Sequence, residues 1–149
     1  MIGYAICGSF CTFARAFDVM RGLTAAGYEL LPILSEAAST INTRFGRAAD
    51  HVKTVVEICG REPVLDIVGA EPLGPKIKLD AIVIAPCTGN TLARLAAGIS
   101  DGAVTMAAKA HLRGDRPMVI AISTNDAMSA NFANIARLME RKHVYFVPF

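Results

Sequence analysis

The sequence predicts an α/β fold with three α/β/α layers, in which helices cover both faces of a doubly wound parallel sheet, as a single domain over residues 1–149. The first observation is that short apolar runs alternate along the chain with segments of helical periodicity. The second is that small polar residues follow the apolar runs, as they do where parallel strands turn into helices. The third is a hydrophobic content of 53%, which suits a sheet that is buried on both faces.

Six apolar runs have the character of buried strands. Strands are predicted at 2–7, 28–34, 64–68, 81–85, 118–122 and 144–147. Pro32 places the second strand near an edge of the sheet, because proline gives no N–H to a strand ladder. For the same reason, Pro86 is expected to end the pairing of the fourth strand.

The segments between these runs carry apolar residues at helical spacing, and glycines such as Gly27, Gly60 and Gly114 mark where they end. Helices are predicted at 13–23, 45–59, 92–99, 104–112 and 132–139. Asn90 or Thr91 is expected to cap the third of them. Segment 69–76 contains two prolines and two glycines, so it is predicted to be a loop.

Composition excludes several classes of protein. The net charge is only +2 and the basic residues are scattered, which argues against nucleic-acid binding but leaves small anionic ligands compatible. No apolar run approaches the roughly 18 residues of a membrane span. The start of the chain lacks a signal peptide, and the spacing of the four cysteines fits neither zinc nor a disulfide framework, so a cytoplasmic protein is expected. The apolar excess then predicts a homo-oligomer.

Four strand exits carry small hydroxyl or amide side chains. They are Gly8-Ser9, Ser35, the segment 86–91 and the segment 123–126. In a parallel sheet all four lie along the same carboxyl edge, where backbone N–H groups at helix starts hold phosphate well. Ordinary helix capping uses the same residue types and remains the alternative. The pattern indicates a phosphorylated cofactor or a nucleotide.

The usual dinucleotide and ATP fingerprints are absent, because residues 8–11 read GSFC and no phosphate-loop lysine motif occurs. A mononucleotide such as FMN, with one phosphate to hold, fits the shorter turn. No metal site is expected, since His51, His111 and His143 lack ligand spacing. Cys87 lies in the proposed ligand turn, but no base is visible beside it to activate the thiol.

Several segments resemble the flavin-containing cysteine decarboxylase family. Residues 85–91, APCTGNT, resemble its PASANT-type turn, and residues 117–148, with Met128 and Asn131, resemble its last strand–helix–strand unit. Other segments narrow the resemblance to the branch formed by the B subunits of dipicolinate synthase. These are 8–12 (GSFCT), 43–46 (TRFG), 68–76 (VGAEPLGPK), 107–110 (AAKA), 123–127 (STNDA) and 145–149 (YFVPF).

The resemblance implies a Rossmann-like sheet that binds FMN where protomers meet. Gly8, Ser9 and Ser35 would then meet the phosphate, while the 86–90 turn would line the isoalloxazine and the substrate. The candidate cofactor-binding residues are Gly8, Ser9, Phe10, Cys11, Ser35, Pro86, Cys87, Thr88, Asn90, Thr91 and Asn125. It also implies a partner, the A subunit of dipicolinate synthase, which resembles a nicotinamide-dependent dehydrogenase and could supply NAD(P). Together they would oxidise a cyclic dihydro-dicarboxylate of the lysine pathway to pyridine-2,6-dicarboxylate, in the mother cell of a spore-former.

The chain departs from the wider family before the 81–85 strand. The decarboxylases carry a catalytic histidine there, in an H-I pair, whereas this chain has Lys76-Ile77. An ordinary lysine stays protonated near pH 7, so it would bind a dicarboxylate rather than shuttle a proton. Lys76 and Arg44 are therefore the candidate substrate-binding residues, and Asn90 and Lys76 the candidate catalytic ones. A phosphopantothenoylcysteine-decarboxylase-like enzyme and a non-catalytic supporting protein remain alternatives. The resembling proteins continue past the position of Phe149 with a C-terminal segment.

Overall fold

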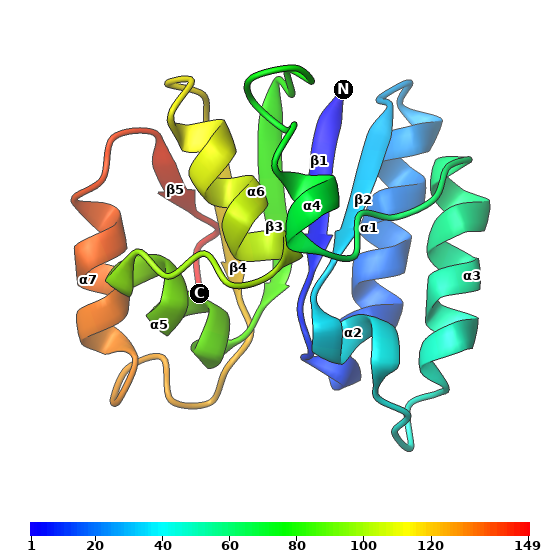
Figure 1. Cartoon of the computed structure of the whole chain (residues 1–149). Coiled ribbons are helices and arrows are strands. Elements are labelled where there is room, and N and C mark those ends of the chain that lie inside the picture. Colours follow the sequence, from blue (N-terminus) through cyan, green and yellow to red (C-terminus); the bar gives the residue numbers. More distant parts are fainter.

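A five-stranded, all-parallel sheet forms the centre of the molecule, and its strands are ordered β2-β1-β3-β4-β5 (Figure 1). The computed structural model describes all residues, 1–149. The strands are β1 (Ile2–Ile6), β2 (Leu30–Leu34), β3 (Ala81–Cys87), β4 (Met118–Ile122) and β5 (Val144–Phe146). The predicted fold class is confirmed, and Pro32 does lie on an edge strand.

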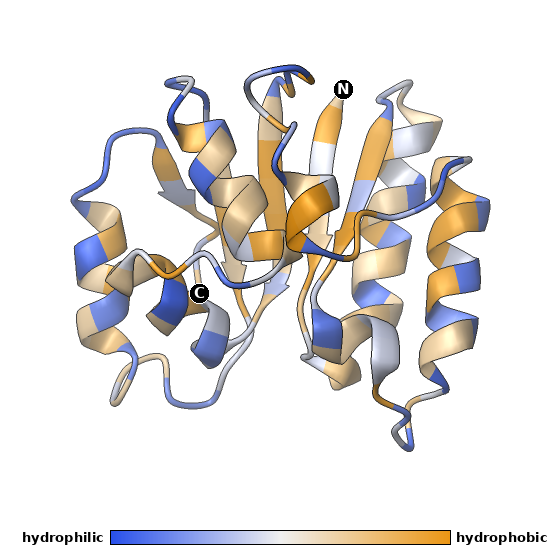
Figure 2. Cartoon of the chain, viewed as in Figure 1, coloured by the Kyte–Doolittle hydropathy of each residue, from blue (hydrophilic) through white to orange (hydrophobic).

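Helices pack on both faces of this sheet, with their apolar sides turned inward (Figures 1 and 2). One face, called here the α5 face, is covered by α4 (Ile67–Ala70), α5 (Gly89–Ala97), α6 (Ala103–Leu112) and α7 (Phe132–Met139). The opposite face, called the α1 face, is covered by α1 (Phe13–Ala25), α2 (Glu36–Thr40) and α3 (Ala48–Cys59). A short 3₁₀ turn (Phe10–Thr12) precedes α1.

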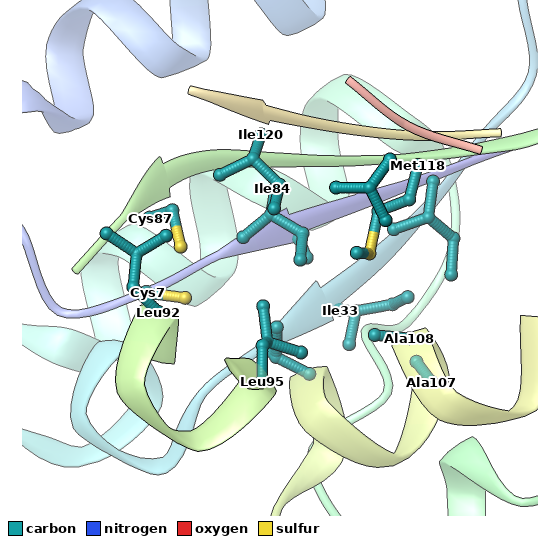
Figure 3. Packing of buried hydrophobic residues seen from close by; sticks show 14 of the residues in the cluster. Cys7, Ile33, Ile84, Cys87, Leu92, Leu95, Ala107, Ala108, Met118 and Ile120 are labelled. Carbon is teal, nitrogen blue, oxygen red and sulfur yellow. The ribbon is translucent and has the colours of Figure 1, made fainter. Parts of the chain in front are cut away.

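The core on the α5 face is the larger of the two. It joins all five strands to their covering helices through close-packed aliphatic side chains such as Ile84, Leu92 and Ile120 (Figure 3). The core on the α1 face gathers only around β1 and β2, with Tyr4, Phe13 and Leu34 among its members. Beyond β3, side chains on the α1 face are only half-buried or exposed.

The predicted strand at 64–68 is wrong. Only Val64 makes a bridge, to Ile33 of β2, and the chain then turns into α4. The carboxylate of Asp66 caps this short helix by accepting the N–H of Gly69 at 2.7 Å. A local side-chain cap thus outcompetes strand pairing. Helix α2 was missed because five residues are too few to display an apolar stripe.

Two expectations about the turn after β3 are also wrong. The strand does not stop at Pro86 but continues to Cys87, with a register shift after Ile84. The carbonyl of Pro86 still accepts the N–H of Cys7 at 3.1 Å, so the proline costs only the donor it lacks. The cap of α5 is Thr88, not Asn90 or Thr91, and the helix begins at Gly89.

No helix in the structure has the length and apolar character needed to cross a membrane.

Candidate functional site

The four polar strand exits meet at the carboxyl edge of the sheet, as predicted. The hydroxyl groups of Ser9, after β1, and Ser123, after β4, lie 2.7 Å apart. Between them, the N–H of Cys7 binds the carbonyl of Pro86, and the N–H of Ser123 donates to the carbonyl of Cys87 at 2.9 Å. Ser35, after β2, donates its N–H to the carbonyl of Ile6 at 3.0 Å. Backbone hydrogen bonds therefore fix these turns side by side.

A cavity of about 320 Å³ opens beside these turns, on the side of α2, α5 and α6. Gly8, Ser35 and Thr88 come from three different strand exits, and all three line it. The amino-terminal ends of α5 and α6 form another wall, because Asn90 and Ala103 also line the cavity. Unpaired N–H groups and helix dipoles at such ends favour an anion.

Arg94 is the one cation that lines this cavity. Its Nε lies 3.5 Å from a carboxylate oxygen of Asp101, which follows α5. The side chains of the two residues are 46% and 58% exposed, so the ion pair is solvated and Arg94 keeps N–H groups free for a ligand. Glu36 also lines the cavity.

The start of α5 is held by side chains on both sides. Inside, the hydroxyl of Thr88 accepts the N–H of Thr91 at 3.2 Å. Outside, the carboxylate of Asp126 accepts the hydroxyl of Thr124 at 2.5 Å and the amide of Asn131 at 2.9 Å. These two donors lower the pKa of Asp126. A Cβ on Gly89 would lie only 2.5 Å from the Asn131 amide nitrogen, so this close approach requires glycine.

The thiol of Cys87 is not available to a ligand. It is fully buried, and its sulfur lies with that of Cys7 in the core beneath α5 (Figure 3). The hydroxyl of Thr91 donates to the Cys7 sulfur at 3.2 Å. Hydrogen bonding to Cys7, reinforced by burial, raises the pKa of Cys87 well above its ordinary value. The Cys87 side chain is therefore part of the core that supports the turn, and a contact between a cofactor and the backbone of Cys87 stays a prediction.

The remaining predicted residues differ in whether they line the cavity. Asn90 is exposed and lines the cavity together with Thr91. Phe10, Cys11 and Asn125 lie at the same sheet edge but outside the cavity lining. Pro86 is buried within β3, and the hydroxyl of Ser9 is engaged by Ser123. Arg44 lies in the exposed turn between α2 and α3, with its guanidinium 4.9 Å from the centre of the Phe45 ring.

Lys76 and Asn90 lie at opposite edges of the sheet. Lys76 belongs to the turn before β3, at the amino edge, whereas Thr88 and Asn90 follow the carboxyl end of that strand (Figure 1). The seven residues of β3 span about 20 Å, several times the reach of a lysine side chain. Within one chain, Lys76 and Asn90 therefore do not meet, and the role expected for Lys76 stays a prediction.

The sequence analysis missed Arg94, Asp101 and Thr105 as cavity residues. One signal could have found the first: Arg94 follows Asn90 by four positions, so the two share one face of α5. Asp101 comes from the α5–α6 connection and Thr105 from the first turn of α6. No pattern in the sequence indicates that this segment packs over the site.

The chain is similar to characterised proteins over nearly its whole length. The family model described as Flavoprotein matches residues 1–148. The B subunit of dipicolinate synthase from Bacillus subtilis is 45% identical over 148 residues, which cover 99% of this chain and 74% of that protein. Flavin prenyltransferase UbiX of Neisseria meningitidis is 26% identical over 148 residues, which cover 99% of this chain and 76% of that protein.

Solved structures agree with these sequence relatives. The crystal structure of the dipicolinate synthase B subunit from Bacillus halodurans matches with a TM-score of 0.88 at 39% identity, covering 99% of this chain and 75% of that one. The FMN-dependent cysteine decarboxylase SpaF matches with a TM-score of 0.77 at 26% identity, covering 97% of this chain and 81% of that one. The resemblance drawn from the motifs is confirmed, and the chain belongs to the Flavoprotein family.

Proposed function

We propose that this chain binds FMN at the carboxyl edge of its sheet and acts as the B subunit of a dipicolinate synthase. In this role it would help to oxidise a cyclic dihydro-dicarboxylate to pyridine-2,6-dicarboxylate, beside the nicotinamide-binding A subunit of that enzyme, in the cytoplasm of a spore-former's mother cell. One observation carries the cofactor part of the proposal. The cavity that joins three strand exits is lined by two helix amino termini and a partly solvated arginine.

The residues of the cavity suit the phosphate and the neighbouring chain of FMN. The hydroxyls of Ser35 and Thr88 and the N–H groups that begin α5 and α6 are donors, and phosphate oxygens accept from all of them. Arg94 adds charge-assisted N–H donors on the side that Asp101 leaves free. Gly8 lets the turn after β1 approach α2 closely, because a Cβ there would lie only 3.0 Å from the Cβ of Ala37.

A bound flavin would supply the two-electron acceptor that a dehydrogenation needs. The protein's own part is to bind and orient the substrate beside it. The exposed amide of Asn90 can donate to a substrate carboxylate at the mouth of the cavity. On oxidation, the substrate loses one hydride equivalent and one proton. The final electron acceptor would be the flavin or the nicotinamide held by the partner.

Binding is tested by titrating the chain with FMN and following flavin fluorescence. We expect a saturable site whose Kd rises at least about tenfold in Arg94→Gln, because one charge-assisted contact is lost. Arg137→Gln, an exposed charge on α7 outside the cavity, is the matched control and should bind as wild type does. No saturable binding, or equal weakening in both variants, would refute the FMN site.

Activity is tested by mixing the flavin-loaded chain with the A subunit, NADP⁺ and the dihydro-dicarboxylate, and measuring pyridine-2,6-dicarboxylate. We expect product from the pair and a loss of rate in Asn90→Ala. Equal rates with and without bound flavin would favour the alternative of a non-catalytic supporting protein. Release of CO₂ from a cysteinyl substrate would instead favour a phosphopantothenoylcysteine-decarboxylase-like enzyme.

The family setting also supports a homo-oligomer. A related decarboxylase from Escherichia coli is described as dodecameric, although at 20% identity it is similar in fold alone. Sedimentation of the isolated chain tests this part, and a monomer at micromolar concentration would contradict it.

A further inference from the structure

A second cavity, of about 360 Å³, lies between α5, α6 and the turn that follows α7. It is separated from the first cavity by the segment that connects α5 to α6, and only Thr105 lines both. Its volume is in the range of small-molecule sites, roughly 300–1,000 Å³. Nothing in the proposed flavin chemistry uses it.

Four cations line this second cavity, and no acidic residue does. Lys109 comes from α6 and Arg113 is its C-cap residue, while Arg141 and Lys142 come from the turn after α7. Of the four, only Lys142 pairs with a carboxylate, that of Asp115 at 3.4 Å, and both side chains of this pair are largely exposed. The result is an excess of positive charge on two walls of the cavity, one formed by the end of α6 and one by the turn after α7.

The helix ends nearby account for only part of this charge: Lys109 lies in the last turn of α6, where the helix dipole favours a cation. The last carbonyls of α6 already accept backbone N–H groups, for example that of Leu112 from Asp115 and that of His111 from Gly114. The carbonyl of Leu95, near the end of α5, likewise accepts the N–H of Gly98. Only Arg141 serves such a carbonyl, that of Ala96, at 3.4 Å. Lys109 and Arg113 donate no hydrogen bond to a carbonyl at a helix end.

Keeping these charges together has a cost. Lys109 in the last turn of α6 and Arg113 at its C-cap are four residues apart, a spacing at which like charges repel. A bound anion would remove that repulsion. The lining also includes the apolar residues Leu95, Ile99 and Leu112, so a carbon skeleton fits there better than a bare inorganic ion.

We propose that this cavity is a second ligand site, distinct from the flavin site, that binds a small organic anion with at least two anionic groups. The two walls would each hold one group through charge-assisted hydrogen bonds. Carboxylates and phosphate esters share this chemistry. The proposal does not depend on the flavin function.

The test is isothermal titration of the whole chain with citrate, fructose 1,6-bisphosphate and sulfate, at one fixed ionic strength. We expect saturable binding of an organic polyanion and little binding of sulfate. A preference for citrate identifies a carboxylate ligand, and a preference for the bisphosphate identifies a phosphate ester. No saturable binding of either, or sulfate binding as tightly as both, overturns the proposal.

Variants then locate the site. In the double variant Lys109→Gln/Arg113→Gln, Kd should rise at least about tenfold, as expected for loss of charge-assisted contacts. Arg15→Gln, an exposed charge on α1, controls for general charge and should bind as wild type does. Arg94→Gln and saturating FMN should also leave binding unchanged. Weakening by either of these, or by Arg15→Gln, would place the anion elsewhere and refute the second site.

Discussion

The edge strand β2 is more deeply buried than the interior strand β4, although both are five-residue apolar segments. In β2 only Leu31 is less than fully buried, whereas in β4 the residues Val119, Ala121 and Ile122 are all half-buried. Position in the sheet therefore does not decide burial here. What decides it is which helices cover each face.

The difference has a clear structural origin. At the β2 end, α1 and α3 cover one face, α6 contacts the other, and Val64 closes the outer edge with two backbone hydrogen bonds of 2.9 Å. One of these donates to the carbonyl of Pro32, whose nitrogen has no hydrogen to donate and is tolerated because β2 is an edge strand. At the β4–β5 end, no helix covers the α1 face, and Tyr145 is 55% exposed.

Of the two truncations compared first, the larger effect is expected at the doubly covered end. Leu34→Ala should lower the free energy of unfolding by about 3 kcal/mol, because it leaves a cavity between β2 and the α1 face helices. Denaturant unfolding measures this. The matched truncation Val119→Ala, on the same face of β4, should cost less than about 1.5 kcal/mol. Equal costs would mean that the two ends are equally buried in solution.

A smaller effect, of opposite sign, is expected at Tyr4. Its side chain is fully buried, its hydroxyl has no hydrogen-bond partner, and burial raises its pKa to about 12. Tyr4→Phe removes this unsatisfied group and should stabilise the protein by about 1 kcal/mol. Thermal unfolding monitored by circular dichroism gives the comparison. A destabilised variant would show that the hydroxyl is in fact satisfied.

A charged residue introduced on the α1 face of β4 tests the same difference in burial between β4 and β2. Val119→Lys should cost less than about 1 kcal/mol in the monomeric state, because its ammonium can reach water. Leu34→Lys, the control at the closed end, should prevent folding, since the charge would be buried without a partner. Unfolding at low protein concentration measures both. Loss of the folded state in Val119→Lys would show that this face is covered.

The smallest effect concerns pH. His111 is buried against the amino end of β4, its Nε2 lies 2.9 Å from the carbonyl oxygen of Pro117, and its Nδ1 has no partner. Burial lowers its pKa below the ordinary 6.5. The unfolded chain therefore takes up a proton first, so stability is full above that ordinary pKa and falls as the pH drops through it. His111→Gln should weaken this dependence between pH 7 and 5, measured by urea unfolding. An unchanged slope would exclude His111 as its source.

Much of the molecule could be predicted because its signals are local. Apolar runs such as residues 81–85 fix the strands, and the polar residues after them mark the carboxyl edge, where the cavity indeed lies. The wrong or missing predictions arose where a side-chain cap replaced strand pairing, or where a segment from elsewhere in the chain packed over the site. Asp66 capped a helix in place of a strand, and Asp101 reached the site through the α5–α6 connection.

The sequence by itself determined most of the strands and helices along the chain, the parallel sheet and the set of turns that form the candidate site, because periodicity and turn chemistry act over a few residues. Only the tertiary structure decided that Cys87 is core, that Lys76 lies at the far edge and that β4 is half-open on one face. These depend on which segments pack against one another, and a residue's own neighbours in the chain do not encode that.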